Sequence, residues 1–396
     1  MKLFFVVLCL SVIIIAYITY NVNEYMGNSL ELREINYSNK KCHLIGIKKT
    51  FNSIIPFNDK FILAAEYNPF LFDKMNYLSI GREQNKLYII NINDDTFSEI
   101  KINNFPKIPF HPHSMSLYKT SSSEYILYIL NHAVAENFDG VDRIELINIK
   151  YNSIKESFEF KYGNTITLPE EFFLKTDSIQ VINEDVFSFT TSKSFPSMRI
   201  STEFNDITNK IKYYAYYFLN MNFINIKKCN VYLYNKKEKP GKEISVLNES
   251  ESMFNKGIAY DKKRNLLYVV KAMEKKMNIF KINEKNKIEL FNTIPILYAG
   301  GNVFYDSDED KIYIGVNGKM SELEAIKNSI IKNGNDDNAI SYSGYEIIDP
   351  NNNYSINHLM IMKNKYKGVS SAIKIGKKIA MSSVYSKGIY VCQNKE

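Results

Sequence analysis

The chain has 396 residues, of which 45% are hydrophobic and 14% are aromatic. It is too apolar to be disordered and too polar overall to be a polytopic membrane protein, which leaves a globular body of one large domain or two ordinary ones. The formal net charge of +7 comes from basic residues in short, scattered clusters. Without a basic stripe interleaved with stacking aromatics, binding to nucleic acid is not expected.

The first 20 residues form a hydrophobic segment. After one lysine, the sequence from Leu3 to about Ile18 is an unbroken apolar run. This fits a signal peptide or a signal anchor, since the run is slightly shorter than the ~20 residues that cross a bilayer comfortably. No small-x-small cleavage site follows it, so removal and retention both stay open. In either case residues 21–41 are expected to be a linker, and the rest of the chain to be secreted or membrane-anchored, facing the ER lumen or the exterior.

Two of the four cysteines, Cys42 and Cys392, stand near the two ends of the expected folded body. In an oxidising compartment, a bridge between them would close almost the whole chain into a ring. Three Asn-x-Ser sequons permit glycosylation, at Asn36, Asn248 and Asn353. Such short matches are common in an Asn-rich chain, so they mark permitted sites of a glycoprotein rather than used ones.

Beyond residue 42 the sequence consists mainly of short runs of β-branched and aromatic residues, separated by turns rich in Asn, Asp, Gly and Lys. Nine runs predict strands, at 61–65, 87–93, 125–130, 144–149, 186–191, 231–234, 266–270, 311–316 and 378–384. Tyr268 and Tyr313 lie 45 residues apart, and Tyr88 and Tyr128 lie 40 apart. These intervals are typical of four-stranded propeller blades. The pattern therefore predicts an all-β propeller.

Two segments interrupt the strand pattern. From 200 to 218, apolar residues recur at alternating steps of four and three, which predicts an amphipathic helix. Such a helix would pack on the propeller rim, or else form a lid or lie on a membrane surface. Residues 321–341 predict a second helix followed by a loop, inserted between strands and without assignable chemistry.

Most candidate sites for metals and nucleotides fail on their spacing. The acidic run at 306–310 lacks the glycine and the twelfth-position carboxylate of a helix–loop–helix calcium site, so it predicts a hairpin turn. His111 and His113 place two imidazoles on one side of an extended segment, but no cysteine pair or HExxH motif supplies the further ligands that zinc needs. The sequence has no P-loop, dinucleotide-binding glycine motif or Gly-x-Ser-x-Gly elbow, which excludes the common nucleotide-binding and serine-hydrolase classes.

His113 and His132 remain as candidates for catalysis. His113 precedes one strand pattern and His132 follows another, so both imidazoles would face one cavity if the two strands pair. One would then act as general base toward water while the other tunes it. Histidines that merely satisfy hydrogen bonds are the commoner interpretation of spacing alone.

Around these histidines the chain resembles the serum paraoxonase/arylesterase family. The family pattern of Phe-x-Pro-His, a strand and then Asn-His is matched by Phe110, Pro112, His113, Ser116, Asn131 and His132. Similarity continues in the segment at 32–34, in three later blade segments and in GIYVC, which ends at Cys392. The resemblance implies a six-bladed β-propeller over residues 42–396, closed by a Cys42–Cys392 disulfide, with an N-terminal hydrophobic helix and helices covering one mouth of the tunnel.

The resemblance also implies a calcium-dependent hydrolase of aryl esters and lactones. In the family, calcium polarises the substrate oxygen while a histidine pair is thought to activate water. This would make His113 the base and His132 its partner.

The calcium ligands of the family fall on positions that have lost most of their carboxylates. They align with Asn52 and Ser53, with Thr176 and Asp177, with Lys256 or, after a one-residue shift, Asn255, and with Gly301 and Asn302. The candidate metal ligands are therefore Asn52, Asp177, Asn255 and Asn302. Calcium affinity follows the number of carboxylates, so binding should be weakened, and a lysine at 256 would oppose it.

Two functional classes follow. One is a hydrolase of the arylesterase or lactonase type, whose partner is a small-molecule ester or lactone. The other is a non-catalytic propeller of the secretory pathway, a pseudoenzyme that has lost the calcium site and serves as a binding or structural module. In both, the N-terminal helix, and also the 200–218 helix if it lies on a surface, would contact a membrane.

Overall fold

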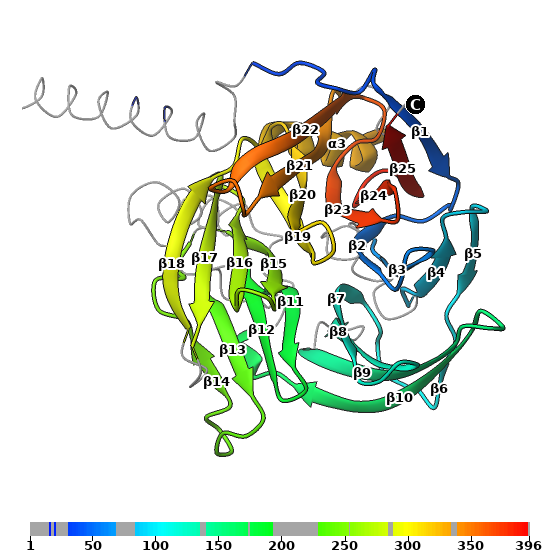
Figure 1. Ribbon diagram of the computed structural model, residues 1–396, viewed down its shortest axis with the longest axis vertical. Helices are drawn as coiled ribbons and strands as arrows, with labels where there is room; N and C mark the ends of the chain where they lie inside the picture. The colour runs from blue at the N-terminus through cyan, green and yellow to red at the C-terminus, as the bar shows by residue number, and fades with distance from the viewer. Residues whose placement is uncertain are drawn as a thin grey trace, which may run out of the picture.

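Six sheets stand around a central axis in the computed structural model (Figure 1). The structure describes residues 16, 20, 31–68, 84–134, 140–172, 175–192, 229–252, 254–283, 288–333 and 339–394. Within these residues, five sheets have four strands and one has five. This confirms the six-bladed β-propeller expected from the sequence and its resemblance.

In each blade consecutive strands run outward from the axis, and in blades 2 and 6 a strand from earlier in the chain adds to the outer edge. Blade 1 contains β2 (Phe51–Pro56), β3 (Phe61–Glu66), β4 (Leu87–Asn91) and β5 (Thr96–Glu99). Blade 2 contains β7 (Pro112–Lys119), β8 (Glu124–Val134), β9 (Gly140–Asn152), β10 (Ser157–Thr167) and the short strand β6 (Ile102–Asn103). Blade 3 contains β11 (Thr176–Asn183), β12 (Val186–Thr191), β13 (Val231–Asn235) and β14 (Ile244–Val246).

The remaining blades repeat this arrangement. Blade 4 contains β15 (Asn255–Asp261), β16 (Leu266–Lys271), β17 (Lys276–Ile282) and β18 (Ile288–Pro295). Blade 5 contains β19 (Ala299–Asp306), β20 (Lys311–Asn317), β21 (Tyr342–Asp349) and β22 (Ser355–Lys363). Blade 6 contains β23 (Val369–Ile375), β24 (Lys378–Ser383), β25 (Ile389–Asn394) and, as its outer strand, β1 (Lys40–Ile45).

The second strand of each blade carries much of the hydrophobic core. Every residue of β3, β12 and β16 is buried, because these strands are paired on both edges and covered on both faces. The nine runs predicted as strands fall on the six second strands and on three third strands. The predicted hairpin turn at 306–310 is also confirmed, since it joins β19 to β20.

The two tyrosine intervals have different origins. Tyr268 and Tyr313 occupy the second strands of adjacent blades, so their interval is a true blade period. Tyr88 lies on a third strand and Tyr128 on a second strand. The shorter interval therefore does not measure a blade, although the architecture inferred from it is correct.

A strand from the N-terminal side completes the last blade. β1 pairs antiparallel with β25, and Cys42 stands directly opposite Cys392. The two cysteines form a disulfide. The predicted bridge is confirmed, and it ties together residues 350 positions apart in sequence.

Each innermost strand contains a β-bulge at an equivalent place. The register with the second strand shifts between Phe51 and Ser53, Pro112 and Ser114, Thr176 and Ile179, Asn255 and Ile258, Gly300 and Val303, and Val369 and Ser371. A bulge re-aims a side chain, and bulges occur often beside active sites. The residues inside these shifts include Asn52, His113, Asp177, Lys256, Gly301 and Ser370.

One α-helix lies within the described residues. α3 (Met320–Asn333) connects β20 to β21, which confirms the helix expected at the start of 321–341; a single 3₁₀ turn, η2 (Glu170–Phe172), precedes β11. The segment expected as an N-terminal hydrophobic helix, apart from Ala16 and Tyr20, and the segment expected as the 200–218 helix fall outside the described residues. Among the helices that the structure does describe, none has the length and apolar character needed to cross a membrane.

Candidate active site

A cavity of about 320 Å³ opens where the innermost strands meet α3. Asn52, His113 and Lys256 line it from the strands, and Met320 and Leu323 line it from α3. Its volume suits a small organic ligand. The helix predicted without a role therefore forms one wall of the principal candidate site.

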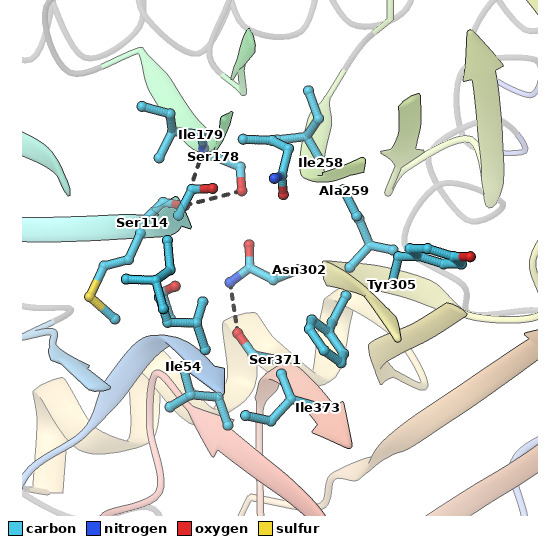
Figure 2. Close-up of a pocket in the computed structure, with 18 of the residues that line it drawn as sticks. Ile54, Ser114, Ser178, Ile179, Ile258, Ala259, Asn302, Tyr305, Ser371 and Ile373 are labelled. Carbon is cyan, nitrogen blue, oxygen red and sulfur yellow. Dashed lines mark hydrogen bonds between the residues drawn. The ribbon is translucent and has the colours of Figure 1, made fainter. Parts of the chain in front are cut away.

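A second cavity of about 230 Å³ is lined by all six innermost strands (Figure 2). Its wall carries hydroxyl groups, with Ser114 Oγ 3.2 Å from Ser178 Oγ. Asn302 donates from Nδ2 to Ser371 Oγ at 2.8 Å and to the backbone oxygen of Asn52 at 2.9 Å. Asn302 therefore links three innermost strands, while its Oδ1 has no hydrogen-bond partner among the described residues.

His113 is buried, and its tautomer is fixed by its partner. Nδ1 lies 2.8 Å from the backbone oxygen of Asp177; because a carbonyl only accepts, Nδ1 carries the proton. Burial lowers the pKa of His113 to about 3, although the Asp177 carboxylate opposes this shift. Asn52 donates to the backbone oxygen of His113 at 2.9 Å. His113 is therefore neutral, with its lone pair on Nε2, which lies 3.3 Å from Asn52 Nδ2.

His132 is oriented by a buried carboxylate. His132 Nδ1 lies 2.7 Å from Asp142 Oδ1, and the two residues are direct cross-strand neighbours on β8 and β9. The other oxygen of Asp142 accepts from the Thr176 hydroxyl. This places His132 and Asp142 in the relation of a base and its orienting acid. Sequence reasoning missed Asp142, although extending the β8–β9 pairing outward by register would have found it.

The two candidate catalytic histidines lie together. The ring centroids of His113 and His132 are 4.9 Å apart, at an interplanar angle of 57°. His111 is also buried, and its burial together with the nearby His132 lowers its pKa to about 4. Its backbone oxygen also accepts from the amide of His132 at 3.2 Å. Three histidines therefore form one cluster, with His113 at the cavity wall.

Lys256 forms an ion pair with Asp177 at the same cavity. Lys256 Nζ donates to Asp177 Oδ2 at 3.1 Å and lies 3.1 Å from Oδ1. Burial alone would raise the pKa of Asp177, but the Lys256 ammonium holds it below its usual value. Asn255 instead donates to the backbone oxygens of Cys229 and Ser250. Of the two alternatives left open at this position, Lys256 is the one at the cavity.

Comparison with known protein families supports the sequence resemblance. A family model described as Arylesterase matches residues 77–332, which is more than half of the chain. The chain belongs to the arylesterase family. No curated protein matches it significantly. The family match covers both candidate histidines, Asp142, Asp177 and Lys256.

Comparison with solved structures gives matches to this arylesterase-family chain at low identity. A luciferin-regenerating enzyme has a TM-score of 0.47 and 8% identity, covering 90% of this chain and 95% of its own. A structure titled as a putative gluconolactonase has a TM-score of 0.47 and 9% identity, covering 93% and 98%. A protein of unknown function from Desulfotomaculum acetoxidans has a TM-score of 0.40 and 8% identity, covering 87% and 90%. Likeness at this level carries no conclusion about substrate.

The residues at the expected calcium position of this arylesterase-family chain do not fit that ion. Asp177 is the one carboxylate among the aligned positions, and the Lys256 ammonium already contacts both of its oxygens. At Gly301, a Cβ would lie 2.3 Å from the backbone oxygen of Ser370, so a larger side chain cannot enter without a shift. In the described part of the chain, no three His, Cys, Asp or Glu side chains are grouped to hold a metal ion. Calcium requires six to eight oxygens with compensating negative charge.

The remaining sites named from sequence lie on the surface. Asn36, Asn248 and Asn353 are all exposed. Asn36 donates from Nδ2 to the backbone oxygen of Leu359 at 2.8 Å. Glycosylation at the three sequons stays a prediction.

Proposed function

We propose that this arylesterase-family protein hydrolyses small aryl esters or lactones, with His113 as general base toward water. The observation that carries the proposal is the contact series from His113 through His132 to Asp142, beside a cavity of about 320 Å³. His113 is neutral, and its Nε2 holds the lone pair that a base needs. The orienting carboxylate distinguishes this arrangement from histidines that only fill a core.

Asp142 has a clear part in this reaction. A histidine with a pKa of about 3 holds a proton poorly, so the proton taken from water needs a second acceptor. His132 lies beside His113, and its Nδ1 is held by the Asp142 carboxylate, which fixes the orientation of its ring. In this proposal His132, oriented by Asp142, is that second acceptor.

The histidine pair would take part in both the attack of water and the departure of the leaving group. Water loses a proton to His113 Nε2 as its oxygen bonds to the carbonyl carbon, and the carbonyl electron pair moves to oxygen. The tetrahedral species then breaks the carbon–oxygen bond to the leaving group. The leaving oxygen takes the proton from the histidine pair, which returns both rings to their starting state.

Hydrolysis of phenyl acetate and of a γ-lactone tests the proposal. Wild-type protein should turn over at least one of them, and His113→Gln should lower kcat by about 10²- to 10⁴-fold. The matched control is His43→Gln, which changes an exposed histidine on β1 that pairs with Asp95; this variant should keep the wild-type rate. Folded wild-type protein without turnover on either substrate class would refute the proposal and favour a non-catalytic binding propeller.

A further inference from the structure

The site holds a positive charge of its own at the place where the family resemblance puts a metal ion. Lys256 lies inside the bulge of β15 and lines the cavity together with His113 and Asn52. Its side chain is 20% exposed, whereas that of Asp177 is 4% exposed. The pair is therefore an almost enclosed cation backed by one carboxylate.

The surrounding chain holds Lys256 in position from both sides. Thr190 donates from its hydroxyl to the backbone oxygen of Lys256 at 2.7 Å. At the next residue, Gly257, a Cβ would lie 2.3 Å from the backbone nitrogen of Val303, so β15 and β19 approach closely there. The Lys256 ammonium also lies 5.7 Å from the centroid of the Phe254 ring, in a cation–π contact.

Asp177 connects the cation to the proposed base. Its backbone oxygen fixes the tautomer of His113, and its carboxylate holds Lys256. An ammonium group has three N–H donors, and its contacts with the two Asp177 oxygens use at most two of them. At least one donor is therefore left for a ligand in the cavity that Lys256 and His113 both line.

We propose that the Lys256 ammonium, held by Asp177, is the resident cation of this site and stabilises the oxyanion in place of a metal ion. This inference rests on the proposed function and names the group that stabilises the oxyanion in that reaction. As water attacks, the carbonyl oxygen gains the electron pair of the broken π bond, and Lys256 donates an N–H to it. A fixed donor aimed at developing charge in a site sheltered from water is the general form of oxyanion stabilisation.

Two kinetic variants test the electrophile. Lys256→Met should lower kcat by about 10²- to 10³-fold, with a smaller change in KM, because the lost contact acts on the transition state. Lys256→Arg should recover part of the rate, since it restores the charge. The matched control is Lys263→Met, a lysine in the same blade that is 70% exposed and pairs with Asp310; its rate should equal that of wild type. Wild-type kcat in Lys256→Met would overturn the proposal.

The Lys256→Met substitution leaves the Asp177 carboxylate buried and unpaired, so this variant could fail to fold. A second variant keeps the test decisive in that case. The double variant Lys256→Met/Asp177→Asn removes both charges and keeps the shape of the pair. It should fold, as judged by circular dichroism, and show the same loss of kcat. A folded double variant with the wild-type rate would also overturn the proposal.

A calorimetric titration of wild-type protein with calcium chloride separates this inference from the proposed function. No binding is expected up to about 1 mM calcium, the range of weak extracellular sites, because the ammonium occupies the carboxylate. Chelator should leave the melting temperature and any turnover unchanged. Calcium binding in this range would overturn the inference even if hydrolysis is found. Absence of hydrolysis without calcium binding would refute the proposed function and leave Lys256 as the cation of a binding site.

Discussion

Removing the Cys42–Cys392 disulfide should lower the free energy of unfolding by several kcal/mol. The cysteines are 350 positions apart, so the bond closes almost the whole propeller into a ring. In the chain-entropy treatment, a loop of this length corresponds to about 6 kcal/mol at 25 °C. The unfolded chain keeps residual structure, and β1 still pairs with β25 from Lys40–Asn394 to Ile45–Ile389. We therefore expect a measured loss of about 2–5 kcal/mol for the Cys42→Ser/Cys392→Ser variant.

Guanidinium unfolding followed by circular dichroism measures this loss, and hydrogen exchange locates it. Amides of β1 and β25 should exchange faster in the double variant, whereas those of β16 in blade 4 should change only with global stability. Reductant supplies the control, because it should destabilise wild type and leave the double variant unaffected. Equal unfolding midpoints for the two proteins would refute the reasoning, since the β1–β25 ladder alone would then close the ring.

Two further variants probe buried carboxylates. Burial raises the pKa of the Glu346 carboxyl to about 7, although hydrogen bonds from the amides of Leu297 and Tyr298 favour its charged form. Because this pKa is above that of the unfolded chain, the stabilising contribution of Glu346 is fully present below about pH 4.5 and is lost as the pH rises through about 7. Relative to wild type, Glu346→Gln should gain about 3 kcal/mol of unfolding free energy between pH 4.5 and pH 8; parallel pH profiles of denaturant stability would contradict this. Asp142→Asn should lower kcat for an aryl ester by about 10²-fold or more, with KM little changed, because His132 loses its orienting carboxylate. A change confined to a higher KM, or to a smaller amount of folded protein, would assign Asp142 a structural role only.

The architecture was accessible from sequence because the second strand of every propeller blade is buried on both faces. Segments such as FILAA in β3 and LLYVV in β16 are continuous apolar runs, which composition alone marks as strands. The innermost strands were not found this way. In β7 and β23, serines interrupt the apolar residues, and a bulge breaks each strand's register with its neighbour. These strands therefore show neither an apolar run nor a clean alternation.

The candidate site was predicted only in part for a related reason. The interval between His113 and His132 follows from a hairpin, which is local in sequence. Asp142 reaches His132 only through the register of β8 with β9, and Lys256 reaches Asp177 only because neighbouring blades stand side by side around the axis. Contacts between side chains of different blades depend on ring closure, which no local pattern specifies.

Hydrolysis of a δ-lactone by metal-depleted protein tests two claims in one measurement: His113 as the general base, and Lys256 as the cation in place of a metal ion. Wild type and His113→Gln would be assayed side by side at neutral pH with chelator present, and then with calcium restored. We predict turnover by wild type that is indifferent to calcium, and a rate about 10²-fold or more lower in His113→Gln. Equal rates for the two proteins would contradict the role of His113, and turnover that appears only when calcium is restored would contradict the role of Lys256.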